Sequence, residues 1–81
     1  MKEDKSIRIR ITGHTDNIGD PRQNLEFYGK RRAEALRDYI VNQGVDEAQI
    51  ECESKGQTEP KVPNDTRANR AINRRAHITI L

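Results

Sequence analysis

The chain has 81 residues, and its 15 basic and 13 acidic side chains leave a formal net charge of only +2. That length allows one small domain with a thin core, and the near balance of charge is weak evidence for a polyanionic partner. Three aromatic residues are too few for the stacking platform of a single-strand nucleic-acid binder, and no apolar run reaches the ~18 residues that span a membrane.

The first predicted element is a strand over residues 7–12. Isoleucines alternate there with arginines and a threonine, which is the period of a strand with one apolar and one basic face. Residues 13–19 read Gly-His-Thr-Asp-Asn-Ile-Gly. They are too polar to extend the strand, so we expect a loop at its C-terminal end.

A helix is predicted after this loop. Asp20 followed by Pro21 matches an N-cap with a proline at the first helical position, and Gly44 is a residue that ends helices. Between them, apolar side chains recur at about 100° per residue on one side. This apolar stripe comprises Leu25, Tyr28, Leu36, Tyr39 and Ile40. We expect one amphipathic helix of about five turns.

Two further strands and a short helix complete the pattern. Residues 50–54 alternate apolar or small side chains with glutamates, so their acidic face is expected opposite the basic face of the first strand. Residues 55–63 predict a loop, Asn64 or Asp65 is expected to open a short helix, and residues 76–80 alternate as a final strand. The order of elements predicts an α/β (α+β) sandwich, a small mixed sheet with helices on one face.

Arg32 is an anomaly within the apolar stripe. It lies four residues after Tyr28 and four before Leu36, whereas Arg31 points about 100° further round. Such an arginine favours a carboxylate ligand, and Asp16 could face it across a small cleft and bind an ammonium group, so the two suit a zwitterion. The alternatives stay open: Arg32 snorkels or pairs with a structural acid, and Asp16 forms a turn.

Catalysis and metal binding lack the residues they need. His14 and Asp16 are two positions apart, but no further metal ligand or activated nucleophile accompanies them, and Cys52 is the only cysteine. We expect no enzyme activity, no cofactor and no metal. A rival hypothesis makes the chain a small basic nucleic-acid-binding α/β domain that contacts phosphates through Arg67, Arg70, Arg74 and Arg75. The alternative for these arginines is a solvated face or internal ion pairs.

The sequence also resembles a known family. The matching segments, in chain order, are Ile11 to Asn17 with Gly19, Arg32-Ala33, Asn64-Asp65-Thr66, Arg70 and Asn73-Arg74-Arg75. Their order and spacing resemble the OmpA-like C-terminal (peptidoglycan-binding) domain family, which includes Pal and MotB, over about residues 7 to 81. The resemblance implies a non-enzymatic module that binds the cell wall.

The resemblance also implies roles for particular residues. In this family the aspartate of the Gly-His-Thr-Asp loop binds the ammonium of the diaminopimelate residue in the peptidoglycan stem peptide, and the arginine of the Arg-Ala pair binds its carboxylate. Carried over, these residues are Asp16 and Arg32. Thr15, Asn17 and Asn24 are expected beside them in the ligand-binding site.

The spacing of the site differs from the family in one respect. An asparagine usually stands seven residues before the binding arginine, whereas Asn24 precedes Arg32 by eight, so one residue is inserted between Asn24 and Gly29. If Asn24 fixes the register, Arg31 replaces Arg32 as the carboxylate ligand. We rank Arg32 first and keep Arg31 as the alternative.

A second difference lies at the N-terminus. The family has a further strand and helix before the strand at residues 7–12, whereas only six residues precede Ile7 here. We therefore expect residues 1–81 to form one domain, a shortened variant or a piece of a larger envelope protein, with a sheet edge or core face exposed. A homodimer would cover that surface.

The resemblance places the chain in the periplasm, associated with the outer membrane or cell envelope, with membrane attachment only through parts absent from this chain. The partner expected is peptidoglycan and not nucleic acid. A flagellar-stator-type wall anchor would use the same chemistry. The nucleic-acid hypothesis differs in its salt response, because binding to phosphates weakens steeply between low and moderate salt.

Overall fold

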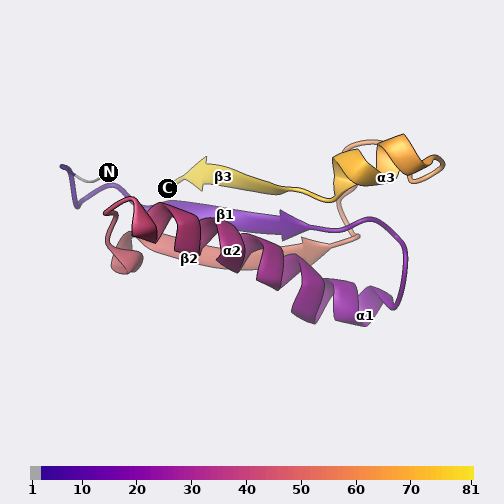
Figure 1. Ribbon diagram of the computed structural model, residues 1–81, viewed down its shortest axis with the longest axis horizontal. Helices are drawn as coiled ribbons and strands as arrows, with labels where there is room; N and C mark the ends of the chain where they lie inside the picture. Colours follow the sequence, from indigo (N-terminus) through magenta and orange to yellow (C-terminus); the bar gives the residue numbers. More distant parts are fainter. Residues whose placement is uncertain (1–2) are drawn as a thin grey trace.

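The computed structural model describes residues 3–81, which form a three-stranded sheet with a long helical segment on one face (Figure 1). The central strand β1 (Ile9–His14) pairs in parallel with β2 (Ile50–Gly56) and in antiparallel fashion with β3 (Ala76–Ile80). The predicted α+β class with a small mixed sheet is confirmed. A short 3₁₀ turn, η2 (Glu47–Gln49), leads into β2.

The core lies between the sheet and helix α2 (Gly29–Asn42). Ile9 and Ile11 of β1 are buried against Ala33 of α2, and Leu36 and Ile40 pack around them. The odd-numbered residues of β1 therefore face the helix, as their alternation predicts. Burial of these side chains supplies the main hydrophobic stabilisation of the domain.

The other face of the sheet is polar. Arg10 lies opposite Glu51 in the register, and their side chains form an ion pair of 3.6 Å. The hydroxyl of Thr12 donates a hydrogen bond of 2.9 Å to Glu53. The predicted pairing of an acidic strand with a basic one is confirmed, although such exposed pairs contribute less than about 1 kcal/mol each.

The helical segment has three parts instead of one. They are α1 (Pro21–Gln23), a π-helical turn η1 (Asn24–Tyr28) and α2. The predicted cap is confirmed, because the Asp20 carboxylate accepts the Arg22 backbone N–H at 2.8 Å. Gly44 follows the helix with a φ of 101°, as expected for the residue that ends it.

The predicted apolar stripe is partly wrong. Leu36 and Ile40 pack on the core, but Leu25, Tyr28 and Tyr39 are exposed. A π-helical turn contains more residues than an α-helical one. The rotation of 100° per residue assumed for a regular α-helix therefore does not hold within η1. Tyr39 lies about 100° before Ile40 around α2, beside the buried face and not on it.

Element ends differ from the sequence prediction at three places. β1 runs on through Gly13 and His14, so the loop begins later than residue 13, and β2 runs to Gly56. A Cβ on Gly13 would lie 1.7 Å from the Gly29 carbonyl oxygen, so only glycine lets α2 approach here, and the register with β2 shifts between Gly13 and His14. The short helix α3 (Arg67–Asn73) is capped by Thr66, not by Asn64 or Asp65.

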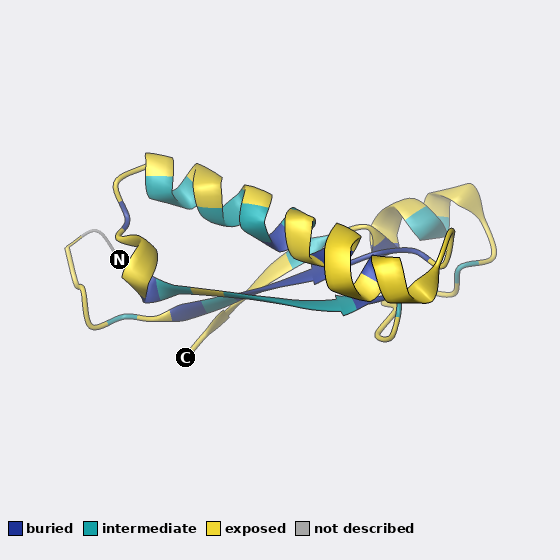
Figure 2. Cartoon of the chain, turned by 90° about the horizontal axis from the view of Figure 1, so that it is seen from below, coloured by how far each residue is buried: buried dark blue, intermediate teal, exposed yellow. Residues whose placement is uncertain are grey.

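The β3 side of the sheet is the least covered. α2 lies mainly over β1 and β2, and α3 sits beyond the end of the sheet and not on its face (Figures 1 and 2). Ile78 and Ile80 share the apolar face with Ile11 and Ile9, yet Ile80 is 76% exposed. No helix within residues 3–81 is long and apolar enough to cross a membrane.

Candidate ligand-binding site

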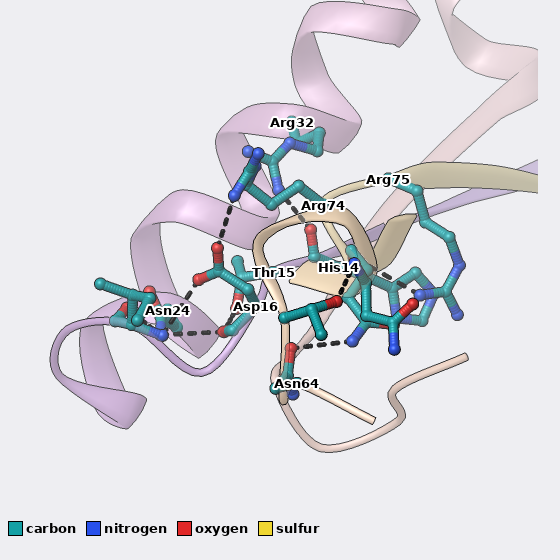
Figure 3. Close-up of polar contacts among 12 residues, drawn as sticks. His14, Thr15, Asp16, Asn24, Arg32, Asn64, Arg74 and Arg75 are labelled. Carbon is teal, nitrogen blue, oxygen red and sulfur yellow. Dashed lines mark hydrogen bonds and ion pairs between the residues drawn. The ribbon is translucent and has the colours of Figure 1, made fainter. Parts of the chain in front are cut away.

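The loop that follows β1 presents a well-fixed carboxylate. One oxygen of Asp16 accepts the Ile18 backbone N–H at 3.0 Å, and the other accepts Nη1 of Arg74 at 2.8 Å (Figure 3). The Thr15 hydroxyl donates to the Asp16 carbonyl at 2.8 Å. Asp16 is therefore buried, held by its own loop and by an arginine 58 positions away.

Asn24, the first residue of η1, holds this loop in place through hydrogen bonds. Its side-chain amide donates to the Ile18 carbonyl at 3.0 Å, to Oε1 of Gln57 at 3.1 Å and to the Asp16 carbonyl at 3.4 Å. Since the side chain is buried and its N–H groups are used within the protein, Asn24 positions the loop. Asn17, by contrast, is exposed at the tip.

Arg32 reaches the same loop from α2. Its Nη1 donates to the carbonyl of His14, and its guanidinium lies beside Arg74 and Asp16 in Figure 3. Among the described residues, no carboxylate lies within ion-pair distance of Arg32, because Asp16 pairs with Arg74. Arg31 is exposed, and its guanidinium stands over the Phe27 ring, 5.4 Å from the centroid.

The electrostatics of this cluster favour an anionic group. Burial raises the pKa of Asp16, but the hydrogen bonds from Arg74 and the Ile18 amide outweigh it and leave the pKa below the ordinary value. Burial, and then the neighbouring Arg74, lower the pKa of Arg32. One carboxylate facing two guanidinium groups leaves the cluster with a surplus positive charge, which a ligand carboxylate would neutralise.

The π-helical turn accounts for the inserted residue. In a regular α-helix, residues seven apart differ by about 20° around the axis, whereas residues eight apart differ by about 80°. Asn24 and Arg32 are eight apart, yet both side chains reach the loop after β1. Because η1 lies between them and takes up the extra residue, the structure brings Arg32 to Asp16 and leaves Arg31 outside.

His14 supports this arrangement from inside the sheet, not from the loop where the sequence suggested it. Its Nε2 lies 3.0 Å from Nδ1 of His77 on β3, and the two rings stack with centroids 5.0 Å apart. Burial, and then Arg75 and His77, lower the pKa of His14 to about 4 against the weaker opposing effects of Glu59 and Glu53. The ring is therefore neutral at neutral pH.

Sequence reasoning missed two residues that organise the site. It placed Arg74 in a basic cluster, where internal pairing was only one alternative, and it gave no role to Asn73. The buried Asn73 side chain accepts the N–H groups of Lys61 and Val62 at 2.9 and 3.2 Å and fixes the loop before α3. The one sequence feature that pointed to Asn73 and Arg74 was the Asn-Arg-Arg motif before the last strand.

The basic cluster is not one surface. Arg74 binds Asp16, and Arg75 donates to the backbone carbonyls of Asn73 and Glu59 at 3.4 and 3.3 Å. Two of its four arginines are thus engaged inside the domain, which weakens the hypothesis of a phosphate-binding face.

The site is an open surface. No pocket is found in the described part of the chain, and the Asp16 and Arg32 side chains lie close together at the surface in Figure 3, so the small cleft expected between them stays a prediction. Nor do residues 3–81 contain a group of three metal-ligating side chains. A surface bearing one carboxylate and two guanidinium groups can bind a charged ligand.

Comparison with known proteins places this geometry in a family. The model of the OmpA family matches residues 1–74. The chain belongs to the OmpA family. OmpA-family relatives include outer membrane porin F of Pseudomonas aeruginosa, 36% identical over 99% of this chain, and the peptidoglycan-associated lipoprotein of the same organism, 38% identical over 88%. The chain spans 23% and 42% of those two proteins.

Solved OmpA-family structures share the fold. The peptidoglycan-associated lipoprotein from Burkholderia pseudomallei superposes with a TM-score of 0.91 at 36% identity, covering 99% of this chain and 67% of that one. The C-terminal domain of Helicobacter pylori MotB gives a TM-score of 0.85 at 29% identity, covering 96% and 60%. The resemblance seen in the sequence motifs is confirmed.

Proposed function

We propose that this OmpA-family chain binds peptidoglycan non-covalently through the diaminopimelate residue of the stem peptide and anchors an envelope protein to the cell wall. The observation that carries the proposal is the juxtaposition of an ionised Asp16 with Arg32, a half-buried guanidinium that has no carboxylate partner among the described residues. Asp16 would bind the ligand's ammonium and Arg32 its carboxylate.

The surrounding residues support these two. Thr15 and Asn24 hold the loop in shape, and the exposed Asn17 is free to offer its amide to the stem peptide. Arg74 helps to keep Asp16 ionised, and its side chain, 44% exposed, can turn aside for the ammonium without disturbing the core. Arg31 is disfavoured as the carboxylate ligand because it stacks on Phe27.

The location follows from the same proposal. The relatives named above are an outer membrane porin, a peptidoglycan-associated lipoprotein and the C-terminal domain of MotB. We place the chain in the periplasm at the outer membrane or cell envelope, with residues 1–81 as one domain of a larger protein whose other parts supply the membrane anchor. Binding is its role, without catalysis or a cofactor.

Co-sedimentation with purified diaminopimelate-type sacculi tests this function. The wild-type domain should pellet with the sacculi and be released by meso-diaminopimelate, but not by cadaverine, which has the same two amines and lacks both carboxylates. Asp16→Ala and Arg32→Ala should stay in the supernatant, whereas Arg75→Gln, which loses a positive charge as Arg32→Ala does, should pellet. Pelleting that moderate salt abolishes for every variant alike would instead indicate non-specific charge binding.

The open β3 side suggests a second partner, which is another copy of the chain. The described residues place no strand along the outer edge of β3, and the apolar side chains of Ile78 and Ile80 extend the core face beyond the cover of α2. Pairing of two β3 strands across a two-fold axis would satisfy the backbone groups of both edges and bury both apolar faces. We propose this homodimer for residues 1–81.

A further inference from the structure

An exposed apolar patch borders the proposed diaminopimelate site. It consists of Ile18 in the loop, 63% exposed, and Phe27 and Tyr28 in the π-helical turn, 51% and 49% exposed. Figure 2 shows this end of the helical segment as almost wholly exposed. An apolar cluster of this kind on a small, highly charged domain marks an interaction surface.

The patch is continuous with the site through specific bonds. The backbone of Ile18 donates its N–H to Asp16 and receives the Asn24 amide on its carbonyl. Tyr28 already has helical backbone angles, so it stands four residues before Arg32 on the same side of the helix, with Cβ atoms about 5–6 Å apart. A ligand held by Asp16 and Arg32 therefore has the patch next to it.

The two aromatic rings pack against each other. Their centroids lie 5.1 Å apart in an edge-to-face arrangement, and the Arg31 guanidinium covers one side of the Phe27 ring at 5.4 Å. The rim is polar, because the Arg22–Glu26 ion pair lies on the same turn. An ordered aromatic surface with charged hydrogen-bonding groups at its edge matches a pyranose ring, which has an apolar C–H face and a rim of hydroxyls.

We propose that Ile18, Phe27 and Tyr28 form a second subsite, which binds the sugar that carries the stem peptide. This inference rests on the proposed diaminopimelate site. The stem peptide joins that residue to the sugar through L-alanine, a γ-linked D-glutamate and the lactyl group, a tether of more than ~10 Å when extended, which is long enough to span the one helical turn, ~5.4 Å, between Tyr28 and Arg32. The inserted residue thus has a use: it turns two aromatic side chains outward while Asn24 and Arg32 keep their inward positions.

Two soluble probes separate this subsite from the peptide site. They are the tripeptide L-alanyl-γ-D-glutamyl-meso-diaminopimelate and the same tripeptide carried on N-acetylmuramic acid. For the wild-type domain, the sugar should tighten binding about tenfold, the gain expected of one well-placed aromatic contact. In Phe27→Ala and Tyr28→Ala this gain should vanish, while the affinity for the bare tripeptide stays within about twofold.

Tyr39→Ala is the matched control, because Tyr39 is the remaining aromatic residue of the chain, is exposed like Phe27 and Tyr28, and lies about three turns further along the helical segment, in α2. It should keep the full gain from the sugar. Equal affinity of the wild-type domain for both probes would overturn the subsite, as would an equal loss of bare-tripeptide binding in the Phe27 and Tyr28 variants with circular dichroism unchanged. Failure of the wild-type domain to bind either probe would instead remove the proposed function itself.

Discussion

Asp16 and Arg74 are 58 positions apart in the sequence and 2.8 Å apart in the fold. No local pattern marks such a pair, because it exists only once β1 and α3 have come together. What could be predicted at the residue scale was Asp16 and Arg32, one from its loop motif and the other from its position in an apolar stripe. Arg74 became visible only through the three-dimensional structure.

The Asp16–Arg74 pair should be worth a measurable coupling energy. In a double-mutant cycle with Asp16→Asn and Arg74→Gln, unfolding by urea should show a coupling of about 1–2 kcal/mol, since the carboxylate is buried and the arginine half exposed. Asp16→Asn with Arg75→Gln is the control and should be additive. Additivity within about 0.5 kcal/mol for the first pair would contradict the role given to Arg74.

His14 should make the domain sensitive to mild acid. Its folded pKa of about 4 lies below the ordinary 6.5, so the unfolded chain takes up a proton first and stability is lost as pH falls from 6.5 to 4. The loss in the free energy of unfolding should be about 2 kcal/mol. It is smaller than the full pKa shift implies, because solvent around the exposed His77 screens its effect on His14. Urea midpoints across this range measure it, and the slope should flatten in His14→Gln. The pKa of Asp16 is lowered, so the stability that its ionised form contributes is lost only as the pH falls below 3.8, the ordinary pKa of an aspartate.

At the scale of elements, all three strands could be predicted because one face of each is apolar and the period of two is strict. The ends were less predictable. Gly13 and His14 are polar or small and still belong to β1, and three successive cap-forming residues, Asn64 to Thr66, left the start of α3 ambiguous. The π-helical turn was invisible, because a search at 100° per residue assumes that the helix is regular throughout.

Deletion of Glu26 tests the account of the π-helical turn. Removing one residue between Asn24 and Arg32 should convert η1 into regular α-helix while both side chains keep facing the loop, so the free energy of unfolding should be unchanged or higher. Deletion of Asp38 is the contrasting case. It turns Ile40 about 100° away from the core and should cost about 2 kcal/mol or more. Equal destabilisation by both deletions would show that η1 does not accommodate an extra residue between Asn24 and Arg32.

At the scale of the whole molecule, the family and the sheet could be predicted, whereas the uneven cover of the sheet could be expected only from the resemblance. The open β3 side leads to a prediction about assembly. Size-exclusion chromatography with light scattering should show a concentration-dependent dimer, and Ile80→Lys should give a monomer with an unchanged circular dichroism spectrum, because Ile80 is exposed within the single chain.

Tyr39→Lys, a charge added on the far side of the helix, should leave the dimer intact. A wild-type monomer whose mass does not change with concentration would remove the self-association proposal. It would leave the ligand site untouched, since none of the site residues lies on the outer edge of β3.

Calorimetric titration of the diaminopimelate tripeptide into the wild-type domain and its Asp16→Ala, Arg32→Ala and Arg31→Ala variants tests the central claim most directly. Binding should be lost in the first two variants and retained in the third, with all four proteins folded by circular dichroism. A folded wild-type domain that does not bind, or binding that survives Arg32→Ala and fails in Arg31→Ala, would contradict the site that η1 and the loop after β1 bring together.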